Sequence, residues 1–218
     1  RAVAQHVRDY FPTHRLRLPP ALRLGVSLSR PGLLTAPAAA IVVRHIVEQV
    51  ARQFIAGAHI HEAMTVVRRM ADRGILVSFD VLGEQVISES EAEASTQRYL
   101  SLIEELSVAC RGLRAPAAVG DRPLVHLSIK PSSLSAHLDP LSMEYSLTQA
   151  FGRLRRIAQH AVNHEAAMTL DMEQFQLRDL TVELAKRLLL EPGIGERVQL
   201  GIVIQAYLRD AQSVVAQL

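Results

Sequence analysis

The order of apolar and amphipathic segments predicts an α/β protein whose parallel sheet is covered by helices. Apolar runs of strand length alternate with helical patterns along the chain, and these runs lack the two-residue alternation of a half-exposed strand. Four runs also end on a polar residue, namely Asp80, Lys130, Asp171 and Gln205. Because ligands of parallel α/β proteins bind at the carboxyl ends of the strands, these four side chains are the first candidates for chemistry.

The first part of the chain, residues 1–44, is expected to be a helical or irregular lead-in, because five prolines between positions 12 and 37 interrupt any helix. The pattern then predicts a helix over Ala38–Gln53 and a short strand over Phe54–Gly57. Apolar residues at helical spacing follow from His59, and Gly74 is expected to end that helix.

The middle of the chain predicts a strand over Ile75–Asp80 and a long helix that starts at a capping box of Ser88 and Glu91. The next strand runs over Leu124–Lys130, where Pro131 prevents it from continuing. The remaining pattern predicts helix, strand, helix, strand and helix, at 147–161, 166–171, 177–188, 198–205 and from Leu208.

Two architectures fit this alternation, a (β/α)8 barrel of the TIM type and an open doubly wound sheet. No GxGxxG or GxxxxGK[ST] motif follows a predicted strand, which favours the barrel. A barrel needs eight βα units and the pattern supplies about five. We therefore expect an incomplete barrel, with residues 45–218 as its N-terminal part within a longer chain.

Composition excludes several classes of protein. The formal net charge of +2 gives no strong field for nucleic acid, and the arginines near the start have no aromatic partners for stacking bases. The single Cys110 excludes an intramolecular disulfide and fits a reducing, cytoplasmic compartment. The apolar stretch at 32–43 is too short to span a bilayer.

Lys130 has three possible roles at a strand tip. It can hold an anionic substrate or cofactor, form a Schiff base as in barrel aldolases, or simply pair with Asp80 or Asp171. Gln205 carries an amide that both donates and accepts, which suits the edge of a planar heterocycle. His160 and His164 have a metal-like spacing on a predicted helix, but the sequence offers no matching third ligand, so we expect no metal site.

Five segments taken together give the chain a specific resemblance to the proline dehydrogenase family, especially to the barrel of bifunctional proline-utilisation flavoproteins. They occur in order along residues 45–218, at Arg52–Gly57, Phe79–Glu84, Leu127–Leu134, Thr169–Gln174 and Gly201–Asp210. The resemblance implies a distorted (β/α)8 barrel that binds FAD and oxidises L-proline to Δ1-pyrroline-5-carboxylate.

The resemblance also implies roles for individual residues. Lys130 is similar to the family's lysine beside substrate and flavin, and Asp171 to its active-site aspartate. Met172 and Gln205 are similar to flavin contacts. Glu84 resembles an acidic residue that pairs with an arginine closing over the substrate.

Two departures from the family pattern affect these expectations. Pro131 stands where the family usually has another apolar residue, which can alter the backbone after the lysine. The family's later strands, which supply further flavin and proline contacts, are not in these 218 residues, so we expect that the 218 residues alone do not oxidise proline.

The alternatives are a lysine-dependent barrel lyase or aldolase and a non-enzymatic scaffold that oligomerises or binds a partner. For the flavoenzyme, the implied partners are L-proline, a quinone or other electron acceptor, and a fused aldehyde dehydrogenase domain. Nucleic acid is not an expected partner. The sequence leaves open whether the protein is a homo-oligomer and whether it associates with the membrane during turnover.

Overall fold

The structure is a computed structural model that describes residues 44–45, 47, 49–51, 54–83, 85–113, 120 and 122–218. The chain divides into two compact units, residues 1–63 and residues 64–218, and the boundary falls within helix α4 (Ile60–Ala71). Most of the lead-in expected at 1–44 lies outside the described residues, as does part of the helix expected at Ala38–Gln53. Where it is described, between residues 44 and 51, that segment is helical.

Within the first unit, the strand expected at Phe54–Gly57 is wrong. The amides of Phe54 and Ile55 both donate to the carbonyl of Ala51, so this segment forms a turn that closes the preceding helix. The side chain of Phe54 is exposed. An apolar run becomes a strand only when its backbone finds a neighbouring strand, and this run uses its amides locally instead.

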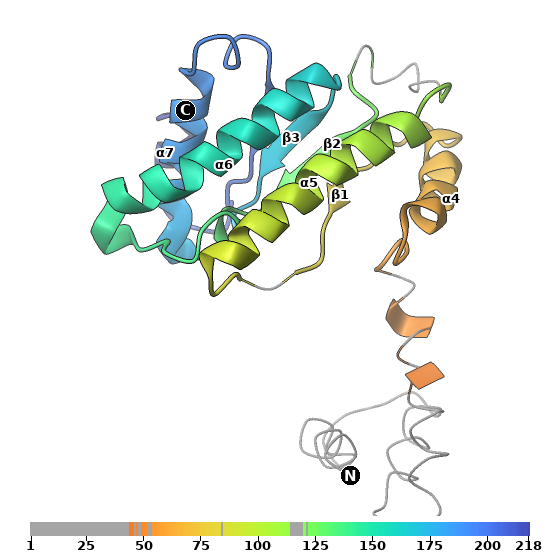
Figure 1. The fold of residues 1–218 in the computed structure, drawn as a ribbon, viewed down its shortest axis with the longest axis horizontal. Helices are drawn as coiled ribbons and strands as arrows, with labels where there is room; N and C mark the ends of the chain where they lie inside the picture. The colour runs from red at the N-terminus through yellow and green to blue at the C-terminus, as the bar shows by residue number, and fades with distance from the viewer. Residues whose placement is uncertain are drawn as a thin grey trace, which may run out of the picture. The chain divides into compact units, whose positions relative to one another are not determined.

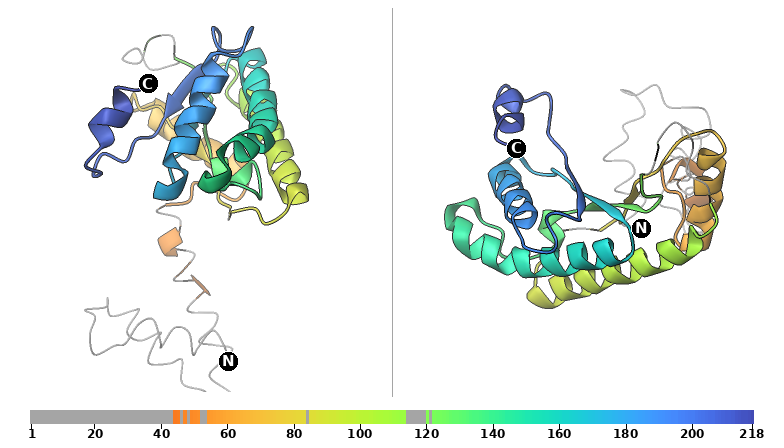
Figure 2. Two further views of the ribbon diagram at one scale, coloured as in Figure 1. Left: turned by 90° about the vertical axis from the view of Figure 1, so that its left-hand side faces the viewer. Right: turned by 90° about the horizontal axis from the view of Figure 1, so that it is seen from above.

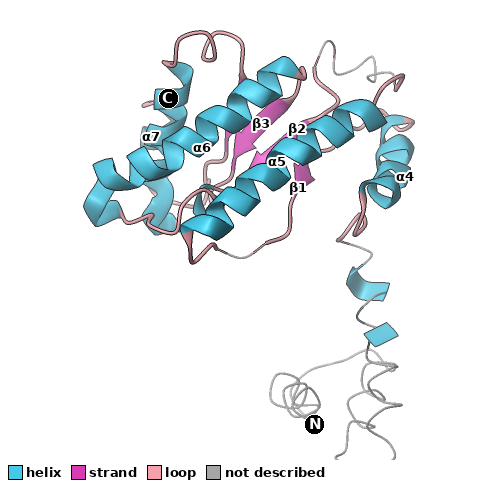
Figure 3. Ribbon diagram, viewed as in Figure 1, coloured by secondary structure: helices cyan, strands magenta, loops and turns pink. Residues whose placement is uncertain are grey.

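The second unit is an α/β layer whose elements alternate along the chain, as Figure 3 shows by colour. The strands are β1 (Phe79–Asp80), β2 (His126–Ile129), β3 (Ala167–Leu170) and β4 (Gln199–Ile202). The helices after α4 are α5 (Glu89–Ala109), α6 (Met143–Asn163), α7 (Arg178–Leu189) and α8 (Ala211–Val215), with short 3-10 turns η2 (Pro131–Ser133), η3 (Pro140–Ser142) and η4 (Phe175–Leu177).

All four strands are parallel and lie in the order β1-β2-β3-β4, which is also their order along the chain. The sheet confirms the predicted α/β class, but it holds four strands in the described residues rather than about five. The strand expected at Ile75–Asp80 is shortened to Phe79–Asp80. Its expected first residue directly follows a turn in which Gly74 has φ 77°, and the amide of Ile75 donates back to the carbonyl of Met70.

One face of the sheet is buried under helices. Helices α5 and α6 lie side by side across this face (Figures 1 and 2), and α7 packs against α6 and β4. The strand side chains on this face are Leu127, Ile129, Met168 and Leu170, and each is almost completely buried. Alternate residues of β2 and β3 are therefore placed in one continuous apolar core.

Helix α5 begins where its sequence predicts. The amide of Glu91 donates to Ser88 Oγ at 3.2 Å, and the Glu91 carboxylate accepts from the amide of Ile87 at 2.9 Å. This confirms the predicted cap at Ser88 and Glu91, with the Glu91 carboxylate reaching the amide of Ile87, one residue before the N-cap Ser88. The Ser88 hydroxyl satisfies a backbone donor that has no partner inside the first helical turn.

The opposite face of the sheet carries small and polar residues that are only half-buried. His126 Nε2 lies 2.7 Å from Thr169 Oγ1 across β2 and β3, and burial lowers the pKa of His126. Gly201 on β4 leaves room for this pair, because a Cβ atom there would lie 2.7 Å from Thr169 Oγ1. In the part of the chain that the structure describes, no helix is long and apolar enough to cross a membrane.

Candidate active site at the carboxyl edge of the sheet

The polar residues that end the predicted strands meet at one edge of the sheet. Ile129 and Leu170 are register partners, so Lys130 and Asp171 follow directly on neighbouring strands, and the amide of Asp171 donates to the carbonyl of Ile129. Asp80 ends β1 on the other side of β2. Parallel pairing thus brings together residues that are far apart in the sequence.

Lys130 forms an ion pair with Asp80. Its Nζ atom lies 3.1 Å from one Asp80 carboxylate oxygen and 3.3 Å from the other. A second carboxylate, that of Glu173, places its Oε1 atom 3.9 Å from Nζ. The lysine side chain is 14% exposed, whereas Asp80 is 46% exposed, so the cation is the enclosed member of the pair.

The charge of Lys130 is settled by two opposing effects. Burial lowers the pKa of the ammonium group, but the hydrogen bond and the charge of Asp80, together with Glu173, outweigh it and leave this pKa above its ordinary value. Lys130 is therefore a cation at neutral pH. A cationic lysine has no lone pair with which to attack a carbonyl carbon.

The backbone around Lys130 is held in place by the buried hydroxyl of Tyr99 on α5. This oxygen accepts a hydrogen bond from the Lys130 amide at 3.3 Å and another from Ser133 Oγ at 3.3 Å. Pro131 does not distort the lysine, since Lys130 has the extended conformation (φ −90°, ψ 116°) that a residue before proline prefers. Pro131 begins the turn η2, where a missing amide proton costs no hydrogen bond.

Asp171, Met172 and Gln205 form a second group along the same edge. The Asp171 carboxylate accepts from the amide of Met172 at 2.8 Å. Gln205 Nε2 donates to the Met172 carbonyl at 3.2 Å, while Gln205 Oε1 is buried and has no hydrogen-bond partner among the described residues. Met172 is 6% exposed. This group therefore holds a buried acceptor beside an apolar side chain.

A hollow of about 340 Å³ lies between α5 and the segment that follows β1, and Lys130 and Tyr99 are among its lining residues. Gly83 and Gln85 also line it, whereas Glu84 itself lies outside the described residues. Asp171, Met172 and Gln205 are not part of this lining. The carboxyl edge thus offers an enclosed cation with open space on its α5 side.

Sequence reasoning missed two residues of this edge. Glu173 approaches Lys130 and also accepts a hydrogen bond from Ser132 Oγ. Tyr99 is expected from the sequence only as part of the apolar stripe of a helix. Glu173 follows Asp171 by two residues within one of the five resembling segments, which is an available signal, but no local pattern indicates that Tyr99 supports the lysine.

Comparison with known families gives two matches. Residues 63–218 match the family described as "Proline dehydrogenase", and residues 1–54 match the one described as "Proline utilization A N-terminal domain".

Several curated proteins are similar to the chain. "Bifunctional protein PutA" of Escherichia coli is 25% identical over 163 residues, which are 75% of this chain and 12% of that protein. "Proline dehydrogenase" of Deinococcus radiodurans is 33% identical over 176 residues, which are 77% of this chain and 51% of that protein. The 218 residues therefore span a small part of the bifunctional relatives and about half of the shorter one.

Solved structures resemble the fold as well. Proline utilization A from Bdellovibrio bacteriovorus, inactivated by N-propargylglycine, has a TM-score of 0.78 and 25% identity and covers 97% of this chain and 22% of its own. The D778Y mutant of proline utilization A from Bradyrhizobium japonicum has a TM-score of 0.63 and 27% identity. This match covers 84% of this chain and 18% of the mutant's chain.

Proposed function

Because the chain belongs to the proline dehydrogenase family, we propose that residues 45–218 contribute part of a (β/α)8 barrel that binds FAD and oxidises L-proline to Δ1-pyrroline-5-carboxylate. Residues 1–44 precede this part along the chain, and residues 1–54 match a different family model. The half-buried face of the sheet, with His126 and Thr169, is then the side that faces the barrel interior. The remaining strands come from the rest of the longer protein.

The residues at the carboxyl edge suit a flavin. Gln205 has a buried acceptor oxygen that finds no partner within the described part of the chain, and its amide nitrogen already donates to the Met172 carbonyl. An oriented acceptor of this kind would receive a ring N–H of the isoalloxazine, and the buried Met172 would supply an apolar contact. FAD, when bound, accepts the electrons that proline loses.

The main support for the proposal is the position and positive charge of Lys130. Its enclosed ammonium group stands at the strand tip beside Asp171 and has more donors than Asp80 alone uses. We assign to it the binding and orientation of the substrate carboxylate, which places the proline ring for hydride transfer. Asp171 is assigned to the same site as a polar residue next to the substrate.

The charge state of Lys130 argues against the lyase alternative. A Schiff-base lysine must lose its proton, and the carboxylates around Lys130 raise the pKa of this side chain instead. A purely scaffolding role would not require a buried acceptor, Gln205 Oε1, that lacks a hydrogen-bond partner among the described residues. Glu84 remains the proposed partner of an arginine that closes over the substrate, and its neighbours Gly83 and Gln85 line the hollow at Lys130.

The wider assignments rest on the relatives. A quinone or another acceptor would reoxidise the flavin, and a fused aldehyde dehydrogenase domain would consume the product, as the name "Bifunctional protein PutA" suggests for the relatives. A cytoplasmic location with membrane contact during turnover, and a homo-oligomeric assembly, belong to the same proposal.

The test uses the full-length protein with FAD under anaerobic conditions. Addition of L-proline should bleach the oxidised-flavin absorption, and Lys130→Met should slow that bleaching by at least about 100-fold, the effect of losing one preorganised charged donor. Lys186 is the other lysine of the chain and lies on α7, so Lys186→Met is the matched control and should react as the unaltered protein does.

Two results would contradict the proposal. One is a full-length protein that takes up no FAD. The other is a substrate-dependent covalent adduct at Lys130 trapped by borohydride, which would favour a lyase. A Lys130→Met protein that binds FAD and is reduced at the unaltered rate would remove Lys130 from the site while leaving the flavoenzyme assignment intact.

A further inference from the structure

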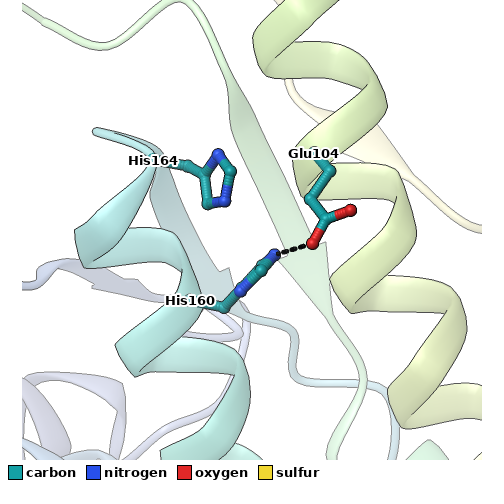
Figure 4. A group of neighbouring side chains, drawn as sticks. All are labelled: Glu104, His160 and His164. Carbon is teal, nitrogen blue, oxygen red and sulfur yellow. Dashed lines mark ion pairs between the residues drawn. The ribbon is translucent and has the colours of Figure 1, made fainter.

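We propose that Glu104, His160 and His164 form a binding site for a divalent transition-metal ion of the zinc class, between helices α5 and α6. The three side chains converge in Figure 4, and one possible ligand atom from each lies within 4.8 Å of the others. This site goes beyond the proposed oxidation of proline and does not depend on it.

The two histidines come from the end of α6. His160 lies in the last turn and His164 caps the helix, so their spacing of four residues places both rings on one side of it. The ring centroids are 4.5 Å apart and the ring planes are inclined by 45°. The sequence showed this pair without a third ligand. The structure supplies Glu104 from α5, which no spacing within either helix could indicate.

The distances suit a metal after small side-chain rotations. A tetrahedral zinc ion with bonds of about 2.0–2.2 Å separates its ligand atoms by roughly 3.3–3.6 Å. Glu104 Oε1 and His160 Nε2 are already 3.1 Å apart, and all three ligand atoms fall within 4.8 Å. Two imidazoles and one carboxylate form a donor set that zinc uses in proteins, with a fourth position left for water.

The alternative is a simple ion pair between Glu104 and a protonated His160. Its geometry is poor, because Nε2 of His160 is buried and makes no hydrogen bond in the described part of the chain, although the carboxylate oxygen lies within ion-pairing distance. A buried ring nitrogen that lacks a directed partner is costly. A metal ion would bind the lone pair of His160 Nε2 directly and would also bind the carboxylate oxygen of Glu104.

The three proposed ligands are carried by well-packed parts of helices α5 and α6. Ile103 precedes Glu104 and is 1% exposed, and on α6 Ile157 and Ala161 flank His160 and are equally buried. Helices α5 and α6 pack along their lengths, so the backbone at the three ligands is held by core contacts. A site on packed helices needs little ordering when the ion binds.

The site is separate from the proposed flavin edge. His164 lines a hollow of about 680 Å³ together with Val125 and Ala166, which directly precede β2 and β3. Lys130 and Asp171 follow the same two strands, so the two sites lie at opposite ends of the sheet. The hollow leaves solvent access for the fourth ligand of the metal.

The experiment is a zinc titration of the full-length, FAD-loaded protein after treatment with a chelator, by competition with a chromophoric zinc indicator. We expect His164→Ala, His160→Ala and Glu104→Gln each to lower the zinc affinity of one site by at least about tenfold. Replacing a residue that only supports a metal ligand already lowers metal affinity by that factor. His137→Ala is the matched control, because His137 is an exposed histidine outside the cluster, and it should leave zinc binding unchanged.

A second readout separates binding from folding. Zinc should raise the thermal unfolding temperature of the unaltered protein by mass action, and this rise should disappear in His164→Ala while circular dichroism stays native. Equal zinc stoichiometry and affinity in the unaltered protein and in His164→Ala would overturn the proposal. If His160→Ala does not fold, His164→Ala and Glu104→Gln decide, because their side chains are not part of the buried core.

Discussion

Replacing Arg153 by methionine should loosen the contact between α5 and α6 at the end opposite the histidines. The Arg153 guanidinium donates to Glu89 Oε2 at 2.6 Å and to the carbonyl of Leu134 at 2.9 Å, and it lies 3.4 Å from a Glu93 oxygen. The arginine side chain is only 17% exposed, although it belongs to the surface of a helix. Methionine keeps the aliphatic part and removes every one of these hydrogen bonds.

The expected loss of stability follows from the two main contacts of Arg153, with the Leu134 carbonyl and with Glu89. Leu134 is fully buried, so its carbonyl would lose a charged donor, which costs about 1.5 kcal/mol. The side chain of Glu89 is 35% exposed, so solvent screens its ion pair, which contributes about 0.5 kcal/mol. The sum of about 2 kcal/mol corresponds to a roughly 30-fold increase in local opening.

Amide hydrogen exchange of the full-length protein measures this opening directly, because it reports the stability of single helices within a large protein. Peptides from the first turns of α5 and the middle of α6 should exchange faster in Arg153→Met. Arg155→Met is the matched control, since Arg155 lies on the same helix but is 54% exposed, and it should change exchange less than twofold. Equal protection of α5 in Arg153→Met and in the unaltered protein would refute the reasoning.

Two further predictions concern the turn after α7 and an ion pair between α5 and α6. Gly195→Ala should lower the calorimetric unfolding temperature, because the new Cβ would lie 1.9 Å from the Leu189 carbonyl oxygen. Gly152→Ala in α6 is the matched control, since its Cβ meets no atom within 4 Å, and it should raise that temperature. An unchanged unfolding temperature in Gly195→Ala would contradict the prediction and show that this turn moves freely. The hydrogen bond from Arg156, aided by the neighbouring Gln97, lowers the pKa of Glu93 from 4.5 to about 2. This pair therefore stabilises the fold fully above pH 4.5 and loses its effect as the pH falls through about 2. The advantage of the unaltered protein over Arg156→Met in acid unfolding should vanish over that range, and an advantage that grows on acidification would contradict this assignment.

The strand tips could be predicted because their signal is local. An apolar run that ends on one polar residue defines both the buried strand and the end at which its polar side chain emerges, and the sequence alone therefore places Lys130 and Asp171 at one edge. The capping box of Ser88 and Glu91 was equally readable, since a helix start depends on residues only three apart. The Phe54–Gly57 strand failed because a strand also needs a partner, which composition does not supply.

The sequence by itself thus determined the α/β class, the order of the helices and strands from His59 onward, and the candidate residues at the carboxyl edge. Only the tertiary structure decided which of them meet. The pairing of Lys130 with Asp80, its approach to Glu173 and the meeting of Glu104 with His160 each join separate elements of the fold. Such contacts depend on strand register and on helix packing, which arise from the whole core rather than from residue spacing along one segment.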